Sequence, residues 1–122
     1  MKNEIKTDGK YLVVNGCAPI EFEEEIERTL DMENVVVVLT VPERGFATSN
    51  RIYGIKDGKV AWRVQDMLDY NPDYAPFMPN PYSGIRIYDK DPGVVLATSA
   101  EGFRFLINPN NGRIIGTESW VK

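Results

Sequence analysis

The stretch NRIYGIKDGKVAWRV, residues 50–64, decides the fold class of this chain. Two short aliphatic and aromatic runs flank Asp57-Gly58, a dipeptide that adopts the positive φ angles of a two-residue hairpin loop. With those residues as the loop, one face of the hairpin pairs Ile55 with Val60, Tyr53 with Trp62, and Arg51 with Val64. We expect this face to be buried. The opposite face is expected to be exposed and carries Ile52, Lys56, Lys59, Ala61 and Arg63.

Turn signals of the same kind recur along the chain, at Asp8-Gly9, Asn15-Gly16, Asp57-Gly58, Glu101-Gly102 and Asn111-Gly112. Most of them separate runs rich in Val, Ile, Tyr, Phe and Thr, which favour strands. The predicted strands are 10–14, 35–41, 51–56, 59–65, 84–88, 94–99, 103–107 and 113–117. At Glu101-Gly102 a two-residue loop pairs Ala100 with Phe103, Thr98 with Phe105, and Leu96 with Ile107. We predict an all-β fold, an antiparallel sheet of hairpins that is curved or two-layered.

Residues 19–30, PIEFEEEIERTL, allow two interpretations. Phe22, Ile26 and Leu30 recur every fourth residue, and Pro19 suits the first turn of a helix. The same residues also share the even parity of one strand face. The surrounding hairpins favour a strand, and a short helix here would make the fold α+β.

Length and composition indicate one globular domain spanning residues 1–122. The chain is 43% hydrophobic and 26% charged, which is typical of a folded soluble protein. Its apolar runs, such as 35–39, are far shorter than a membrane span. The charged N-terminus lacks the apolar segment of a secretory signal, and the lone Cys17 fits a reducing compartment, where it is expected to be at least half-buried. We expect a cytoplasmic protein.

The net charge of −4 is concentrated in residues 21–33, which hold seven acids against Arg28. Such a segment repels a phosphate backbone, because nucleic-acid affinity depends on lysine and arginine. We therefore expect no nucleic-acid partner.

Residues 66–84, DMLDYNPDYAPFMPNPYSG, are predicted to form a long loop. Four prolines, at positions 72, 76, 79 and 81, disfavour a helix or a ladder strand over most of it. Long loops in small domains are often functional, and this one carries several aromatic side chains. It either folds back to cap an open end of the core or forms a contact surface in which Asp66, Asp69 and Asp73 flank tyrosines.

The residue inventory leaves little acid–base chemistry. The chain has no histidine, which removes histidine bases and the common zinc sites, and it has no phosphate-binding glycine loop. Paired carboxylates from Asp66, Asp69 and Asp73 remain as the basis for a less favoured carboxylate-dependent hydrolase. We predict that the chain is not an enzyme and uses no cofactor or metal.

The segments NRIYGIKDGKVAWRVQD, YSGIRIYDKDPGVVLATSAEGFRFLI and NPNNGRIIG together resemble a single blade of a PQQ-type β-propeller, with a tryptophan after a D-G-K turn. A closed propeller needs several blades, so only one blade plus N-terminal strands fits the chain. The pattern from residue 10 to residue 122 also resembles small bacterial single-domain β proteins that are presumed to be immunity proteins of polymorphic toxin and contact-dependent growth inhibition systems.

This resemblance implies an intracellular immunity protein that binds and neutralises a cognate toxin domain. A nuclease toxin must hold nucleic acid and is therefore basic, which suits an acidic partner. The predicted partner-binding residues lie in two groups, the acidic segment and the aromatic loop, and either could form the binding face: Glu21, Glu23, Glu24, Glu25 and Glu27, and Asp66, Asp69, Tyr70, Asp73, Tyr74 and Phe77. The alternative is a small-ligand-binding or structural β domain.

Overall fold

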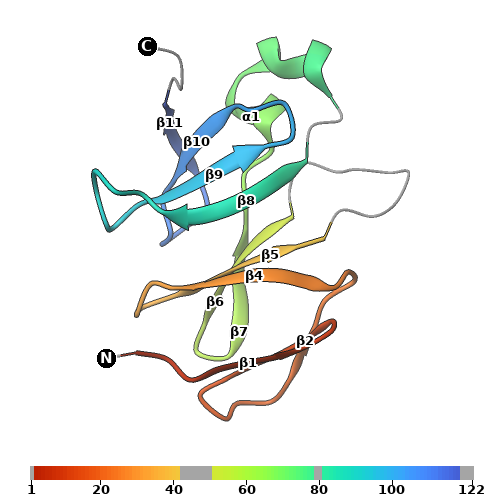
Figure 1. Ribbon diagram of the computed structural model, residues 1–122, viewed down its shortest axis with the longest axis vertical. Coiled ribbons are helices and arrows are strands. Elements are labelled where there is room, and N and C mark those ends of the chain that lie inside the picture. The colour runs from red at the N-terminus through yellow and green to blue at the C-terminus, as the bar shows by residue number, and fades with distance from the viewer. Residues whose placement is uncertain (1, 42–50, 79–80, 119–122) are drawn as a thin grey trace.

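The computed structural model describes residues 2–41, 51–78 and 81–118 (Figure 1). Part of the quoted hairpin stretch, Asn50, and one loop proline, Pro79, lie outside these residues. The described chain is built from antiparallel strands in three sheets, with one short α-helix and one short 3-10 helix. The predicted all-β class is confirmed.

Each sheet is a meander in which strands adjacent in sequence pair with one another. The N-terminal sheet contains β1 (Ile5–Asp8), β2 (Tyr11–Val14) and β3 (Ile20–Glu21). The middle sheet contains β4 (Ile26–Asp31), β5 (Val36–Thr40), β6 (Ile52–Lys56) and β7 (Lys59–Arg63). The C-terminal sheet contains β8 (Tyr82–Ile87), β9 (Val95–Ser99), β10 (Arg104–Ile107) and β11 (Ile114–Thr117). The segments that resemble a propeller blade are divided between the middle and C-terminal sheets.

The three sheets lie one above another in Figure 1, so the middle sheet is covered on both faces. The valine run of β5 shows this arrangement most clearly. Val35, Val37 and Leu39 pack in the cluster shared with the C-terminal sheet. Val36 and Val38 pack in the cluster shared with the N-terminal sheet. Alternate side chains of one strand therefore enter two separate cores, which is why the fold has three layers and not two.

The hairpin of β6 and β7 confirms the predicted loop and corrects its register. Asp57 and Gly58 have φ angles of 52° and 74°, and Ile55 pairs with Val60 as expected. A bulge then shifts the register, so that Trp62 lies opposite Gly54, and Tyr53 lies opposite Arg63. The predicted pairing of Tyr53 with Trp62 is wrong because the indole needs a partner without a side chain.

The predicted faces of this hairpin are wrong at other positions too. Ile52 was expected to be exposed but is 0% exposed, because β6 is an interior strand between two layers. Val60 was expected to be buried but is 47% exposed on the edge strand β7. Val64 donates its N–H to the carbonyl of Ile52 at 2.8 Å and does not pair with Arg51.

The hairpin of β9 and β10 also differs from its prediction by one residue. Phe105 pairs with Ala97, and Leu106 pairs with Leu96. The loop has three residues, 100–102, because Ser99 donates its N–H to the carbonyl of Phe103 at 2.9 Å. Gly102 takes the left-handed position of this loop, with φ 90°.

Trp62 and Gln65 join the middle sheet to the C-terminal sheet. The Trp62 Nε1–H donates to the carbonyl of Pro109 at 2.8 Å. The side-chain oxygen of Gln65 accepts the N–H of Ile114 at 2.9 Å. The backbone N–H of Gln65 donates to the carbonyl of Gly112 at 2.9 Å. Residues 62–65 therefore hold two layers together.

The two ambiguous segments have definite structures. Residues 19–30 form β3 and β4 in two different sheets, so the strand interpretation is correct and the helix interpretation is wrong. The 66–84 segment contains α1 (Met67–Tyr70), the 3-10 helix η1 (Pro72–Phe77) and the start of β8. The expectation of a plain loop is wrong because Asp66 caps α1, and Pro72 occupies the first turn of η1.

Candidate functional site

The five predicted glutamates lie together where the chain passes from the N-terminal sheet to the middle sheet. We call Glu21, Glu23, Glu24, Glu25 and Glu27 the acidic ridge. Four of them are exposed, and Glu24 is half-buried. Within the described part of the chain, none makes an ion pair, and Glu21 accepts a 3.3 Å hydrogen bond from the Tyr11 hydroxyl. The ridge is a concentration of negative charge without an ion pair to any residue that the structure describes.

The backbone of the ridge is fixed at both ends. Phe22 is buried in the core beneath it, where its ring lies 5.0 Å from that of Tyr53. The N–H groups of Phe22 and Ile26 donate to the carbonyls of Lys10 and Gly9, each at 2.9 Å. The carbonyl of Glu25 accepts the N–H of Val41 at 2.8 Å. A partner would therefore meet these carboxylates in a largely preformed arrangement.

The remaining acids of the 21–33 segment lie at the far end of β4 and have another role. Asp31 accepts hydrogen bonds from the N–H of Asn3 at 2.8 Å, from Asn3 Nδ2 at 2.7 Å and from the N–H of Glu33 at 2.9 Å. Burial would raise the pKa of Asp31, but these hydrogen bonds outweigh it and lower the pKa. Asp31 therefore holds the N-terminal segment against the middle sheet and is not part of the ridge.

The second predicted group forms a cap on the C-terminal sheet. Tyr70 and Tyr74 are half-buried and pack on the core. The Tyr74 ring lies 5.2 Å from that of Phe103 and 5.3 Å from that of Phe105, and the Tyr70 ring lies 6.5 Å from Phe105. Phe77 also contacts Phe103, at 5.0 Å, but stays 43% exposed. The aromatic side chains thus pack as the core-capping interpretation expects.

Two of the three cap carboxylates accept hydrogen bonds from residues close to them in sequence. Asp66 accepts the N–H of Leu68 at 2.9 Å, and Asp69 accepts Gln65 Nε2 at 2.7 Å. Asp73 is exposed. Beneath the cap, the hydroxyl of Tyr82 is buried with no hydrogen-bond partner among the described residues, and burial raises the pKa of this phenol. A phenol with a raised pKa stays protonated near neutral pH and does not serve as a base.

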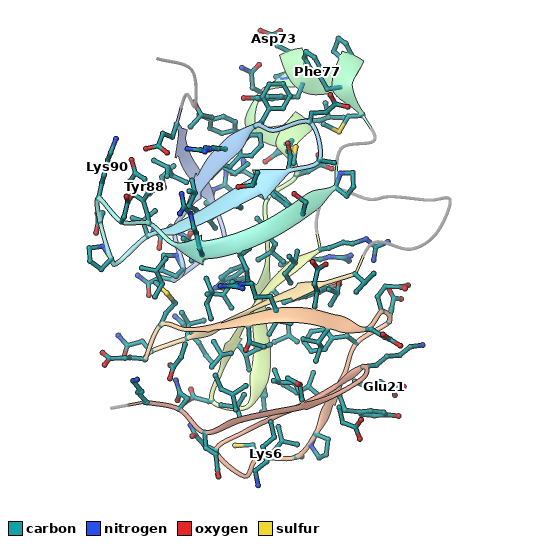
Figure 2. All side chains as sticks on the ribbon, in the orientation of Figure 1. Lys6, Glu21, Asp73, Phe77, Tyr88 and Lys90 are labelled. Atoms are coloured by element: carbon teal, nitrogen blue, oxygen red, sulfur yellow. The ribbon has the colours of Figure 1, made fainter. Side chains whose placement is uncertain are left out.

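The two predicted groups lie far apart. Figure 2 shows Glu21 at the lower right of the molecule and Asp73 and Phe77 at its top, beyond the C-terminal sheet. One compact interface cannot cover both groups at its centre. The acidic ridge and the cap are therefore separate candidates.

A charged network on the C-terminal sheet has no counterpart among the predicted residues. Glu118 accepts the Tyr88 hydroxyl at 2.7 Å and pairs with Lys90 and Arg104, both at 3.3 Å. The hydrogen bond from Tyr88 lowers the pKa of Glu118 and raises that of Tyr88, so neither is activated as a general acid or a nucleophile. Because its members are distant in sequence, no local pattern could have identified this network.

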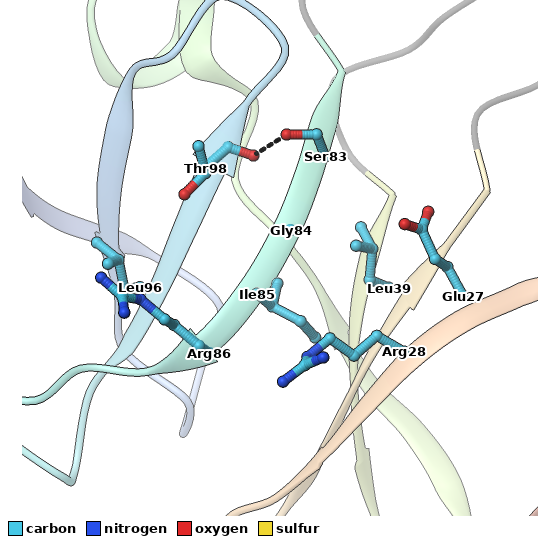
Figure 3. A pocket seen from close by; sticks show the side chains of 9 residues that line it. All are labelled: Glu27, Arg28, Leu39, Ser83, Gly84, Ile85, Arg86, Leu96 and Thr98. Carbon is cyan, nitrogen blue, oxygen red and sulfur yellow. Dashed lines mark hydrogen bonds between the residues drawn. The ribbon is translucent and has the colours of Figure 1, made fainter.

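A groove between the middle and C-terminal sheets was also not predicted (Figure 3). It lies where the edge strands β4 and β8 face each other and has a volume of about 290 Å³. Its lining includes Glu27 and Arg28 of β4, Leu39 of β5, and Ser83, Ile85 and Arg86 of β8. We call this hollow the β4–β8 groove. Its mixture of aliphatic and charged groups suits binding more than acid–base chemistry.

Cys17 is exposed, which corrects the expectation of a buried or half-buried thiol. It follows the Asn15-Gly16 turn, outside both cores. Within the described residues, no three Cys, Asp, Glu or His side chains are grouped as metal ligands would be. No helix in that part of the chain is long and apolar enough to cross a membrane.

These features define an all-β protein with three stacked antiparallel sheets, an exposed acidic ridge and a groove between two edge strands. Residues 2–119 match the family described as Domain of unknown function (DUF7957), and the chain belongs to this family. No curated protein and no solved structure matches the chain significantly.

Proposed function

We propose that this chain is a non-enzymatic binding protein whose acidic ridge contacts a basic protein partner. The observation that carries the proposal is the set of five glutamates on a fixed backbone, without ion pairs to any described residue. Exposed, unpaired charges of one sign steer a partner of opposite sign and raise the association rate. Bringing such exposed carboxylates to the rim of an interface costs little desolvation free energy, because they remain partly hydrated there.

The partner class follows from the resemblance described above. A nuclease toxin domain must bind phosphates and therefore presents lysine and arginine. An immunity protein in the cytoplasm that covers this basic surface would block nucleic-acid binding. The proposed role is thus an immunity protein of a polymorphic toxin system. In this role the catalytic activity belongs to the toxin, and the immunity protein only binds it.

The test first reads the gene next to this one and, where that gene encodes a large secreted protein, takes the C-terminal domain of that protein as the binding partner. The variant Glu23→Lys/Glu25→Lys reverses two ridge charges at exposed positions, and Asp73→Lys is the matched control on the cap. We expect the ridge variant to associate roughly tenfold more slowly at low salt, with the difference shrinking at high salt, as stopped-flow kinetics would show. The control should associate at the wild-type rate.

Three results contradict the proposal. One is a ridge variant that associates at the wild-type rate at every salt concentration. Another is a larger effect at Asp73, which would move the binding face to the cap. The third is a neighbouring toxin-like domain that does not bind this protein at all, which would remove the immunity role.

A further inference from the structure

The β4–β8 groove lies between two edge strands that face each other without forming a ladder. Among the described residues, β4 pairs only with β5, and β8 pairs only with β9. Each edge carries a bulge beside the groove, at Glu27 on β4 and at Ser83 on β8. Bulges interrupt regular pairing and redirect side chains, and they are common next to functional sites. Beyond the bulges, residues 28–31 of β4 and 84–87 of β8 keep a regular register with their partners.

A second hollow continues the groove along the same two strands. It has a volume of about 510 Å³ and lies where the ends of β4 and β8 meet three hairpin turns. Asp31 of β4 and Ile87 of β8 line it, together with Met32 and Pro92 from the adjoining turns. Ile87 is 43% exposed. Residues 27–31 of an extended strand span roughly 14 Å, so the two hollows together have the length of a short extended peptide.

The charges of the groove indicate which peptide would fit. Arg28 and Arg86 are exposed and make no ion pair with any residue that the structure describes, although the chain holds 18 acids and 14 bases. Figure 3 shows Arg28 reaching from β4 toward β8, while Arg86 extends from β8 toward Leu96. Because the two guanidinium groups point to different places, they suit two separated carboxylates better than one phosphate.

We propose that the β4–β8 groove binds an extended acidic segment of a partner protein. The segment lies along the groove between these strands, places alternate acidic side chains near Arg28 and Arg86, and places an aliphatic side chain in the second hollow against Met32 and Ile87. Residues of β4 and β8 already lie within 8 Å of each other, so no further strand fits between the two edges. Charge pairing with the two arginines and the aliphatic contact therefore supply the affinity. The groove shares only Glu27 with the acidic ridge, and this proposal does not depend on the basic partner proposed above.

One carboxylate opposes this ligand. Glu27 lines the groove beside Arg28, and Figure 3 shows its side chain directed toward Leu39. Removing the charge of Glu27 should therefore strengthen the binding of an acidic peptide, whereas removing the charge of either arginine should weaken it.

The experiment is an NMR titration of the isotope-labelled protein with the capped peptide Ac-Ser-Glu-Val-Glu-Leu-Ser-NH2. Amide shifts should concentrate on β4 and β8, and the lysine peptide Ac-Ser-Lys-Val-Lys-Leu-Ser-NH2 should bind about tenfold more weakly. The variant Arg28→Glu/Arg86→Glu should reverse that preference, and Glu27→Gln should tighten the acidic peptide. Arg113→Glu, an exposed arginine outside both hollows, is the matched control.

The three variants change only exposed side chains, and thermal unfolding would verify that they fold. Three outcomes overturn the proposal. One is an acidic peptide that causes no shifts on β4 or β8 at millimolar concentration, and another is equal binding of both peptides to every variant. Concentration-dependent shifts on β4 and β8 without peptide would assign the groove to a second copy of this chain.

Discussion

The contact between Trp62 and Gly54 gives the sharpest test of the fold. The indole is 9% exposed, lies opposite Gly54 across the β6–β7 pair, and donates its Nε1–H to Pro109 in the C-terminal sheet. A Cβ added at Gly54 would clash with Cε2 of Trp62. Gly54→Ala should therefore expel the indole from its position and act like the removal of the tryptophan itself.

The magnitude follows from what the indole contributes. Trp62→Ala loses buried area, leaves a cavity and removes the Pro109 hydrogen bond, which together cost roughly 3 to 5 kcal/mol. Gly54→Ala should cost about as much. In the double variant the added methyl group enters the space that the indole has left, so the second substitution should cost about zero. The coupling should then reach roughly 3 kcal/mol or more, and additive effects would total roughly 6 to 10 kcal/mol.

Urea unfolding followed by circular dichroism measures these differences, since the signal does not depend on the tryptophan. Gly84→Ala is the matched control, because a Cβ at Gly84 in strand β8 meets nothing within 4 Å. It should change the free energy of unfolding by less than about 1 kcal/mol. Additive effects of Gly54→Ala and Trp62→Ala would refute the proposed stacking of the indole on the glycine.

Two other predictions concern residues whose roles differ from their sequence-based interpretation. The lowered pKa of Asp31 means that its hydrogen bonds stabilise the fold above about pH 3.9, its unfolded value, and that this contribution is lost as pH falls through the lower folded value. In the Asp31→Asn variant, the free energy of unfolding should fall less steeply as the pH is lowered in the acid range. An unchanged pH dependence would contradict this. Tyr74→Ala should lower the free energy of unfolding by about 3 kcal/mol because its ring packs on Phe103 and Phe105, whereas Phe77→Ala should cost less. Equal losses in thermal unfolding experiments would contradict the distinction.

Most strands could be located from the sequence because their ends carry local signals. The Asp57-Gly58 turn fixed the hairpin of β6 and β7, and the strand predicted at 94–99 matches β9 within one residue. Strand β1 has no continuous apolar run, and it was not predicted. It pairs with β2 from Ile5↔Val14 to Asp8↔Tyr11 across the turn at Gly9, so the turn signal was present, but the strand itself is too polar to be recognised.

Register and burial were harder to predict because bulges and layers are not local. The bulge between Gly54 and Ile55 arises from the indole of Trp62, whose hydrogen-bond acceptor Pro109 is distant in sequence. The run Val35–Leu39 did contain an informative signal. Five consecutive apolar residues predict a strand that is buried on both faces, and with that interpretation a third layer follows.

The acidic ridge was predictable as a charged segment, but its separation from the cap was not. Spacing in sequence gives no information about distance between residues in two different sheets, and Glu21 and Asp73 lie at opposite ends of the molecule. The groove depended even more on tertiary structure, because Arg28 and Arg86 meet only where two sheets come together.

The two proposed binding surfaces meet at β4, and the three-layer packing explains why. The faces of the middle sheet are covered by the other two sheets, so this sheet can present groups to a partner only along its edges. β4 is one of those edges, and the bulge at Glu27 separates its two surfaces. The ridge residues before the bulge are all acids, whereas the groove after it carries Arg28 and Arg86. Glu27 itself belongs to the ridge and also lines the groove beside Arg28. This distribution of charge is a physical reason to expect that the ridge and the groove select different ligands.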